Sequence, residues 1–169
     1  MLTLPMVATW RSLDRYRCDD SVWSAADIHF GMKDDQKIAW ATGPYQFHQR
    51  APRGIQTFTM GCRRHTGGIF HLQFANWRRL VAKHAWYKMD DVTRWPGRRS
   101  VVEVDSQYNA APKDNGAGFR AIPESWWNPE IKALIRLDGI PWFEEACRTM
   151  VATHGREKFA GLDLFGVVQ

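Results

Sequence analysis

The feature that most constrains the fold of this chain is a short apolar run that passes directly into a long amphipathic stretch. The run follows the glycine pair Gly67–Gly68 and covers Ile69–Phe74, with the polar residues His71 and Gln73 at alternating positions. Alternation within an apolar run is typical of a strand. The sequence therefore predicts a strand that carries two polar side chains on one face.

A long helix is predicted immediately after this strand. Asn76 can accept hydrogen bonds from the first free amides of a helix, and Pro96 with Gly97 forbids its continuation. Between these limits apolar residues recur at steps of three and four, as on one face of a helix: Trp77, Leu80, Val81, Ala85, Met89 and Val92. The junction of strand and helix carries a histidine, a glutamine and several arginines.

Length and composition indicate one globular domain, residues 1–169, of a size that buries a substantial core. Hydrophobic residues make up 44% of the chain, which argues against disorder, and no apolar run approaches the roughly 20 residues of a membrane helix. Three cysteines without a CxxC spacing fit neither a disulfide framework nor a zinc site, so we expect a cytoplasmic setting. The net charge of +5 suits an anionic partner.

The remaining pattern predicts a small mixed sheet with flanking helices, an α/β or α+β fold. The first expected strand is Leu2–Trp10, where Pro5 suits an edge strand or a strand that enters from a turn. Two further strands are expected to end near Phe30 and Trp40 around the acidic turn Asp34–Asp35, and another over Ile55–Met60. Arg11–Asp20 is expected to be a loop. The further helices are expected around Val101–Tyr108, from Pro129 to Ile135, and from Pro141 to His154, before an apolar tail over Phe159–Val168 that packs on the body.

Segments along most of the chain resemble the C-terminal half of bacterial family 2 glycosyltransferases. The segments that carry the resemblance are Trp10–Arg11–Ser12, Asp14–Arg15–Tyr16–Arg17, His48–Gln49–Arg50, Phe70–His71–Leu72–Gln73–Phe74, Trp77–Arg78–Arg79–Leu80, Lys83–His84–Ala85–Trp86–Tyr87–Lys88–Met89, Arg94–Trp95–Pro96, Trp126–Trp127 and Gly161–Leu162–Asp163–Leu164–Phe165–Gly166. This resemblance implies a partial GT-A-like fold, the acceptor-side portion without the N-terminal nucleotide-binding half. The Asp-x-Asp motif of that half does not occur in this sequence.

The resemblance also implies a chemistry. Such enzymes transfer a sugar, with inversion, from a nucleotide diphosphate sugar to a glycan or lipid-linked acceptor in polysaccharide biosynthesis, and activity is expected where the donor half is present. A divalent metal, Mn or Mg, is expected as cofactor, with His71 as its ligand or in contact with the diphosphate. The alternative for His71 is a core histidine with satisfied hydrogen bonds.

Two acidic residues are candidates for the catalytic base. Two close carboxylates raise the pKa of one of them toward working pH, so Asp34 and Asp35 could take the acceptor proton. The alternative is an ordinary hairpin turn.

Candidate substrate-binding residues come from two places in the chain. His48, Arg50 and Arg53 form a loop cluster that can contact phosphate or sugar, because arginine offers a bidentate fork; solvated loop charge is the alternative. Trp126 and Trp127 can stack on a sugar ring, or instead attach a loop to the core.

The sequence is also compatible with functions other than sugar transfer. A non-catalytic glycan- or anion-binding domain is the main alternative. Nucleic-acid binding is not expected, because the basic residues are scattered among acidic ones and no known motif occurs. Basic residues along the long helix and beyond it could also contact the inner face of the membrane, where a lipid-linked acceptor would be met: Arg78, Arg79, Lys83, Lys88, Arg94, Arg98 and Arg99.

Overall fold

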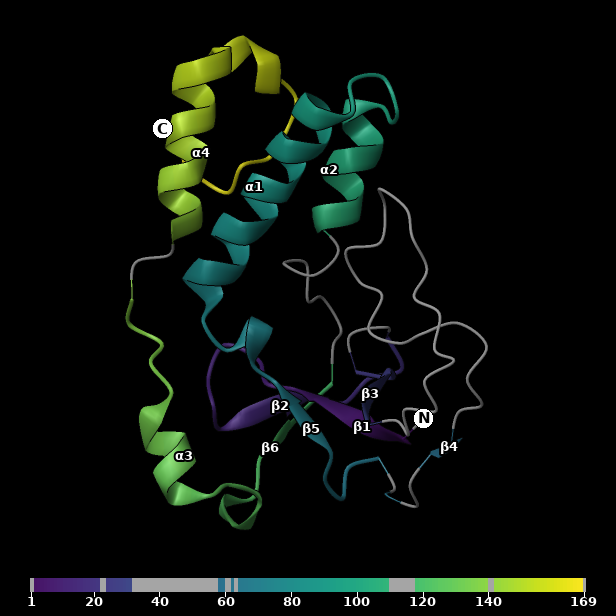
Figure 1. Ribbon diagram of the computed structural model, residues 1–169. Helices are drawn as coiled ribbons and strands as arrows, with labels where there is room; N and C mark the ends of the chain where they lie inside the picture. The colour runs from purple at the N-terminus through teal and green to yellow at the C-terminus, as the bar shows by residue number, and fades with distance from the viewer. Residues whose placement is uncertain are drawn as a thin grey trace, which may run out of the picture.

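The computed structural model describes residues 2–21, 24–31, 58–59, 62, 64–109, 118–139 and 142–168. In these ranges the protein combines two small β-sheets with four α-helices, as expected of an α+β fold (Figure 1). The strands are β1 (Leu2–Ala8), β2 (Arg15–Arg17), β3 (Asp27–Gly31), β4 (Phe58–Thr59), β5 (Ile69–His71) and β6 (Phe119–Ala121). The helices are α1 (Trp77–Arg94), α2 (Val101–Asn109), α3 (Pro129–Leu134) and α4 (Trp142–His154). Figure 1 shows α1, α2 and α4 gathered at one end of the molecule and the sheets at the other.

Strand β1 lies at the centre of the larger sheet. It pairs with β3 in antiparallel orientation and, on its other side, with β4 and β5 in parallel orientation. Of the two alternatives predicted for this strand, the edge strand is therefore wrong. Pro5 is tolerated because it falls between the residues that pair with β4, Leu2 and Thr3, and those that pair with β5, which begin at Met6.

The close approach of β5 to β1 depends on Gly68. Its φ of +151° is unfavourable for other residues, and a Cβ atom there would lie only 2.2 Å from the carbonyl oxygen of Pro5. Gly68, in the glycine pair before the apolar run, thus allows the backbone of this segment to lie directly against the backbone of β1 at Pro5.

Strand β5 is shorter than the sequence predicts. It ends at His71, and Leu72–Phe74 form a single 3₁₀ turn, η1, so His71 and Gln73 do not share a strand face. The turn carries Phe74 into the interior, where it is fully buried and stacks on Trp10 with ring centroids 4.7 Å apart. Burial of this aromatic pair explains why the chain leaves the extended conformation early.

The long helix is confirmed. Asn76 caps α1 by accepting a hydrogen bond from the Arg79 N–H over 2.8 Å, and its own side-chain N–H donates to the Leu137 carbonyl over 2.7 Å. The buried face of α1 includes Leu80, Ala85 and Met89, and Pro96 follows its last turn.

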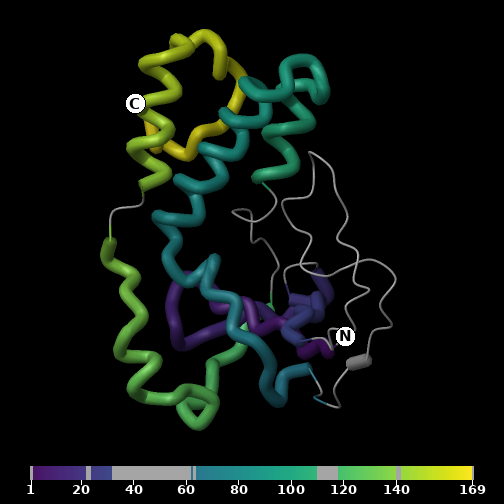
Figure 2. The backbone as a smooth tube through the Cα atoms, viewed as in Figure 1, coloured from purple at the N-terminus to yellow at the C-terminus, as the bar shows by residue number. Residues whose placement is uncertain are grey.

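The other predicted helices are also present. Helix α2 matches its prediction, α3 ends one residue before Ile135, and α4 ends at His154 as expected. The predicted loop over Arg11–Asp20 was wrong in part, because it contains β2, which pairs with β6 in antiparallel orientation. Figure 2 shows these two distant segments side by side. Residues 32–57 and 110–117 lie outside the described ranges, and with them the predicted strand near Trp40.

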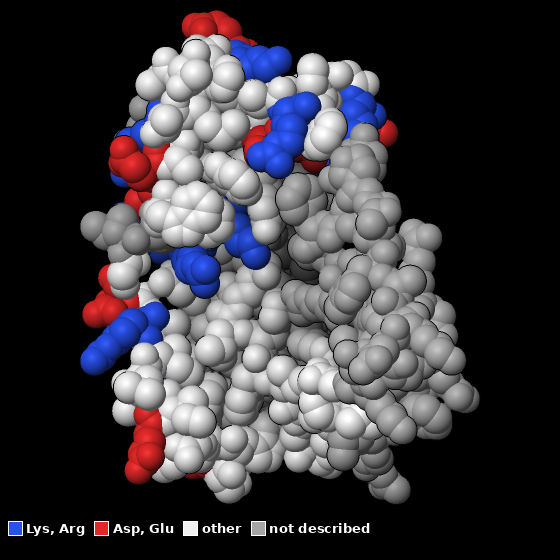
Figure 3. Space-filling view, viewed as in Figure 1, with Lys and Arg blue, Asp and Glu red and all other residues white. Residues whose placement is uncertain are grey.

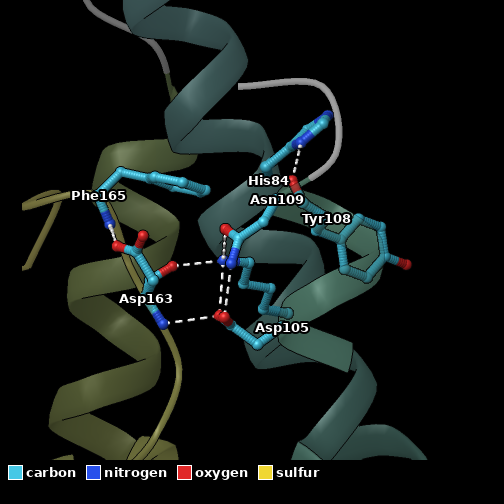
Figure 4. Close-up of polar contacts among 7 residues, drawn as sticks. His84, Asp105, Tyr108, Asn109, Asp163 and Phe165 are labelled. Atoms are coloured by element: carbon cyan, nitrogen blue, oxygen red, sulfur yellow. Dashed lines mark hydrogen bonds and ion pairs between the residues drawn. The ribbon is translucent and has the colours of Figure 1, made fainter. Parts of the chain in front are cut away.

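The C-terminal segment packs on the helices, which confirms the prediction for the tail. Phe159 is buried in one cluster with Ala85, Met89 and Cys147. Beside this cluster, Asp105, Asn109 and Asp163 turn toward one point between the helices (Figure 4), where they surround the ammonium group of the fully buried Lys88.

All three cysteines, Cys18, Cys62 and Cys147, are free thiols. None of the helices in the described ranges has the length and apolar character that a membrane crossing requires.

Candidate functional site

The carboxyl ends of β1 and β5 meet at one edge of the sheet. The two strands are parallel, and Ala8 pairs with His71 at this edge. Ligands of open sheets with parallel strands bind outside the carboxyl ends of those strands. We therefore expect a ligand-binding site among the residues that follow Ala8 and His71.

Two hydrogen bonds join the segments that leave the strands. The Thr9 hydroxyl donates to the His71 carbonyl over 3.2 Å, and the Arg11 N–H donates to the Phe74 carbonyl over 2.8 Å. Arg11 has a φ of 59°, in the left-handed region that non-glycine residues seldom occupy. The backbones of Arg11 and His71 are thus held at the same edge of the sheet.

Three arginines, which we call the arginine cluster, pack on aromatic rings beside this edge. The guanidinium of Arg11 lies 4.0 Å from the ring centroid of Trp77, and that of Arg17 lies 4.9 Å from the ring of Trp10. Arg15 lies 4.9 Å from the Phe119 ring and donates from Nε to the Trp10 carbonyl over 2.9 Å. Cation–π contacts of this kind fix the positions of cations that would otherwise be mobile.

One carboxylate balances part of this charge. Asp19 accepts a hydrogen bond from Arg17 Nε over 2.7 Å. Burial acts to raise the pKa of Asp19, but hydrogen bonds from Ser21, Ser24 and Arg17 to the charged form outweigh it and lower the pKa to about 2. Asp19 is therefore ionised at neutral pH and pairs with Arg17, while Arg11 is exposed at the surface.

His71 is half buried at this edge, and its ring lies 5.6 Å from that of Phe74 between centroids, with the two planes 66° apart. Magnesium and manganese need several oxygen ligands, and a single imidazole does not supply them. Within the described ranges no group of three His, Cys, Asp or Glu side chains is arranged to hold a metal. The described residues therefore do not form a metal site by themselves, and the role of His71 as a metal ligand stays a prediction.

Two of the predicted substrate-binding residues, Trp126 and Trp127, pack on the core of the protein. Trp127 is buried and stacks on Phe70 with centroids 4.1 Å apart and planes 6° apart, while Trp126 is half buried against Tyr16 at 5.8 Å. These contacts favour the alternative in which the pair attaches its loop to the core. The other predicted residues lie outside the described ranges: Asp34, Asp35, His48, Arg50 and Arg53.

The arginine cluster is not among the site residues that the sequence predicts, because the sequence predicts a charged loop over Arg11–Asp20. The alternation of Arg15, Tyr16 and Arg17 is the signal that predicts a short strand, with Tyr16 turned into the core. A further polar contact lies at the start of α1, where Lys83 Nζ donates to Gln73 Oε1 over 3.0 Å.

Charge on the face in Figure 3 is concentrated over the helices, where Lys and Arg lie close to Asp and Glu, and the central part of the face over the sheet is mostly uncharged. Comparison of the chain with protein-family models, with curated proteins and with solved structures found no match.

Proposed function

We propose that this chain is the acceptor-side portion of an inverting glycosyltransferase of the GT-A type, and that His71 and Arg11 contact the diphosphate of its nucleotide sugar donor. The proposal combines the family resemblance of the segments around His71 with the position of that residue. The observation that carries it is the pairing of Ala8 with His71, because it brings a histidine and an arginine to the carboxyl ends of two parallel strands.

The residues at this edge suit an anionic leaving group. Sugar transfer from a nucleotide diphosphate develops negative charge on the diphosphate, and fixed donors beside that charge lower the barrier. Arg11 offers a guanidinium that can bind two phosphate oxygens at once, and its contact with Trp77 limits the freedom that binding would remove. The imidazole of His71 adds an N–H donor.

The proposal involves no step through a metal ion, since the described residues do not form a metal site. Its acceptor is a glycan or a lipid-linked glycan, as the resemblance implies. The catalytic base is proposed among Asp34 and Asp35.

Binding of inorganic pyrophosphate tests the proposal, because this probe carries the diphosphate without a choice of nucleoside. Titration calorimetry at low salt is expected to show binding that weakens about tenfold in His71→Ala and in Arg11→Ala. Arg148→Ala is the matched control, because Arg148 is an exposed arginine of α4 paired with Glu145 at 2.9 Å, and this variant should bind like the parent. Equal affinity of all four proteins would remove His71 and Arg11 from the site.

A second measurement separates transfer from mere binding. Turnover of UDP-, GDP- and dTDP-sugars, measured by release of the nucleoside diphosphate, is expected where the donor half is present and should fall there in His71→Ala. Pyrophosphate binding without turnover of any nucleotide sugar, even with the donor half present, would contradict the transferase proposal and favour a non-catalytic anion-binding domain. Oligonucleotide binding that falls steeply with salt would instead indicate a nucleic-acid-binding protein.

A further inference from the structure

A pocket of about 630 Å³ lies among the helices, away from the carboxyl ends of β1 and β5. Its lining comes from the second half of α1, the turn that follows, α2, and the first turn of α4. Ligand pockets of proteins commonly have volumes of roughly 300–1,000 Å³, so this pocket has the size of a small-molecule site. None of its lining residues belongs to the arginine cluster or to β5.

One wall of the pocket is aromatic. Trp142 stacks on Phe143 with ring centroids 3.9 Å apart, and Trp86 meets Trp142 edge-on at 5.8 Å. Phe143 is only 5% exposed, whereas Trp142 is 57% exposed. The wall is therefore a large aromatic surface that is held from behind and remains accessible.

The polar part of the pocket is an ion pair. Arg99 pairs with Asp91 and also donates to the side chain of Gln107. Asp91 is 8% exposed and Arg99 is 25% exposed. In the described part of the chain, Asp91 Oδ1 and Arg99 Nε are buried polar atoms without a hydrogen-bond partner. These two atoms have almost no accessible surface, so a ligand in the pocket would contact other atoms of the carboxylate and the guanidinium.

These features together select a class of ligand. A carboxylate and a guanidinium that line the same pocket suit a hydroxyl group, which can donate to the one and accept from the other. Three arginines and two aspartates line the pocket, and their near balance of charge favours a neutral ligand over a polyanion. The C–H faces of a sugar pack well on an exposed tryptophan, which offers an apolar surface beside polar groups.

We propose that this pocket binds a saccharide, with Trp142 as the stacking surface and the Asp91–Arg99 pair as hydrogen-bonding partners of its hydroxyl groups. The proposal is independent of the transferase function, because it uses different residues and does not require turnover. In particular, His71→Ala should leave saccharide binding unchanged.

An array of immobilised neutral, amino and acidic oligosaccharides, followed by calorimetric titration of the strongest binder, tests this proposal. We expect Trp142→Ala to weaken binding about tenfold or more, Trp142→Phe to retain most of the affinity, and Asp91→Asn to weaken it about fivefold. Phe30→Ala is the matched control, because Phe30 is an aromatic residue of β3 that is 47% exposed outside the pocket. The melting temperature of each variant shows whether it is folded.

Three results would overturn the proposal. One is the absence of binding to every member of the array, and another is binding that survives in folded Trp142→Ala. The third is selective binding of UMP or AMP that is lost in Trp142→Ala, which would identify the pocket as a nucleobase site.

Discussion

The ammonium group of Lys88 donates a hydrogen bond to Asp105 Oδ1 over 2.8 Å in a position where Lys88 is fully shielded from solvent. It also donates to Asn109 Oδ1 over 2.8 Å and to the carbonyl of Asp163 over 2.6 Å (Figure 4). One cation thus connects α1, α2 and the C-terminal segment.

Lys88→Met is expected to lower the free energy of unfolding by about 3–5 kcal/mol, because it leaves Asp105 charged and without its main partner. Urea denaturation followed by circular dichroism measures this loss. Lys158→Met, at an exposed lysine near the C-terminus, is the control and should change stability by less than about 0.5 kcal/mol. A loss in Lys88→Met as small as in the control would show that the buried pair is not needed for stability.

Asp19 is expected to make the stability of the protein depend on pH at the acidic end. Its pKa is lowered from 3.8 to about 2, since hydrogen bonds to the charged form outweigh the opposing effect of burial. The folded state thus binds its proton less readily than the unfolded state. The stabilisation is complete above pH 3.8 and is lost as the pH falls toward about 2.

Asp19→Asn removes this contribution. At pH 7 we expect the variant to be less stable by about 1–2 kcal/mol, as for the loss of charge-assisted hydrogen bonds. The difference from the parent protein should shrink between pH 3.8 and about 2 in denaturation curves recorded at each pH. A difference that stays constant over this interval would mean that Asp19 has an ordinary pKa in the folded protein.

Gly68→Ala is expected to disturb the site more than any other glycine substitution in the larger sheet. The added Cβ would lie 2.2 Å from the Pro5 carbonyl oxygen, so β5 has to move away from β1. We expect a loss of at least about 2 kcal/mol from strain and overpacking, together with weaker pyrophosphate binding, because His71 ends the displaced strand.

Gly139→Ala provides the comparison for Gly68→Ala, since a Cβ at Gly139 meets no atom within 4 Å. Thermal denaturation of both variants separates the effect of the backbone contact from the general effect of replacing a glycine. Equal melting temperatures would contradict the contact between Gly68 and Pro5.

Asn76 is expected to stabilise the junction through both ends of its amide. Asn76→Ala loses the cap on Arg79 N–H and the bond to the Leu137 carbonyl, at a cost of about 1–2 kcal/mol. Asn76→Asp keeps a capping oxygen but cannot donate to Leu137, so its loss should be smaller. Urea denaturation of the two variants compares the free energy contributed by the cap with that contributed by the bond to Leu137. If Asn76→Asp were less stable than Asn76→Ala, the cap would not stabilise the protein.

The helices could be predicted from the sequence because their limits are set by local chemistry. The Asn76 cap and Pro96 define α1, and Pro129 opens α3, without reference to the rest of the chain. The sheet could be predicted less well, because pairing depends on distant residues. Pro5 suited an edge strand or a strand that enters from a turn, and only the gap between β4 and β5 shows why a proline can lie in a central strand.

The residues of the candidate site are also difficult to predict from the sequence, because strand pairing between distant segments brings them together. His71 is a candidate because of the family resemblance of the segment around it, and its strand is indicated by the glycine pair and the short apolar run. Arg11 could not, because its place beside His71 comes from parallel pairing of β1 with β5 and from the bond to the Phe74 carbonyl. For Trp127 the sequence leaves open sugar stacking or attachment of its loop to the core, and the packing of its ring on Phe70 favours the second.

The central position of β1 has a consequence for the order of folding. During synthesis β1 and β3 can pair early, but the parallel partner β5 at the other side of β1 lies much later in the chain, since Thr9 and His71 are 62 positions apart. Such non-local pairing is slow to form. A ribosome-bound chain that stops before His71 would therefore expose one unsatisfied side of its first strand, and this is the stage at which chaperone binding should be strongest.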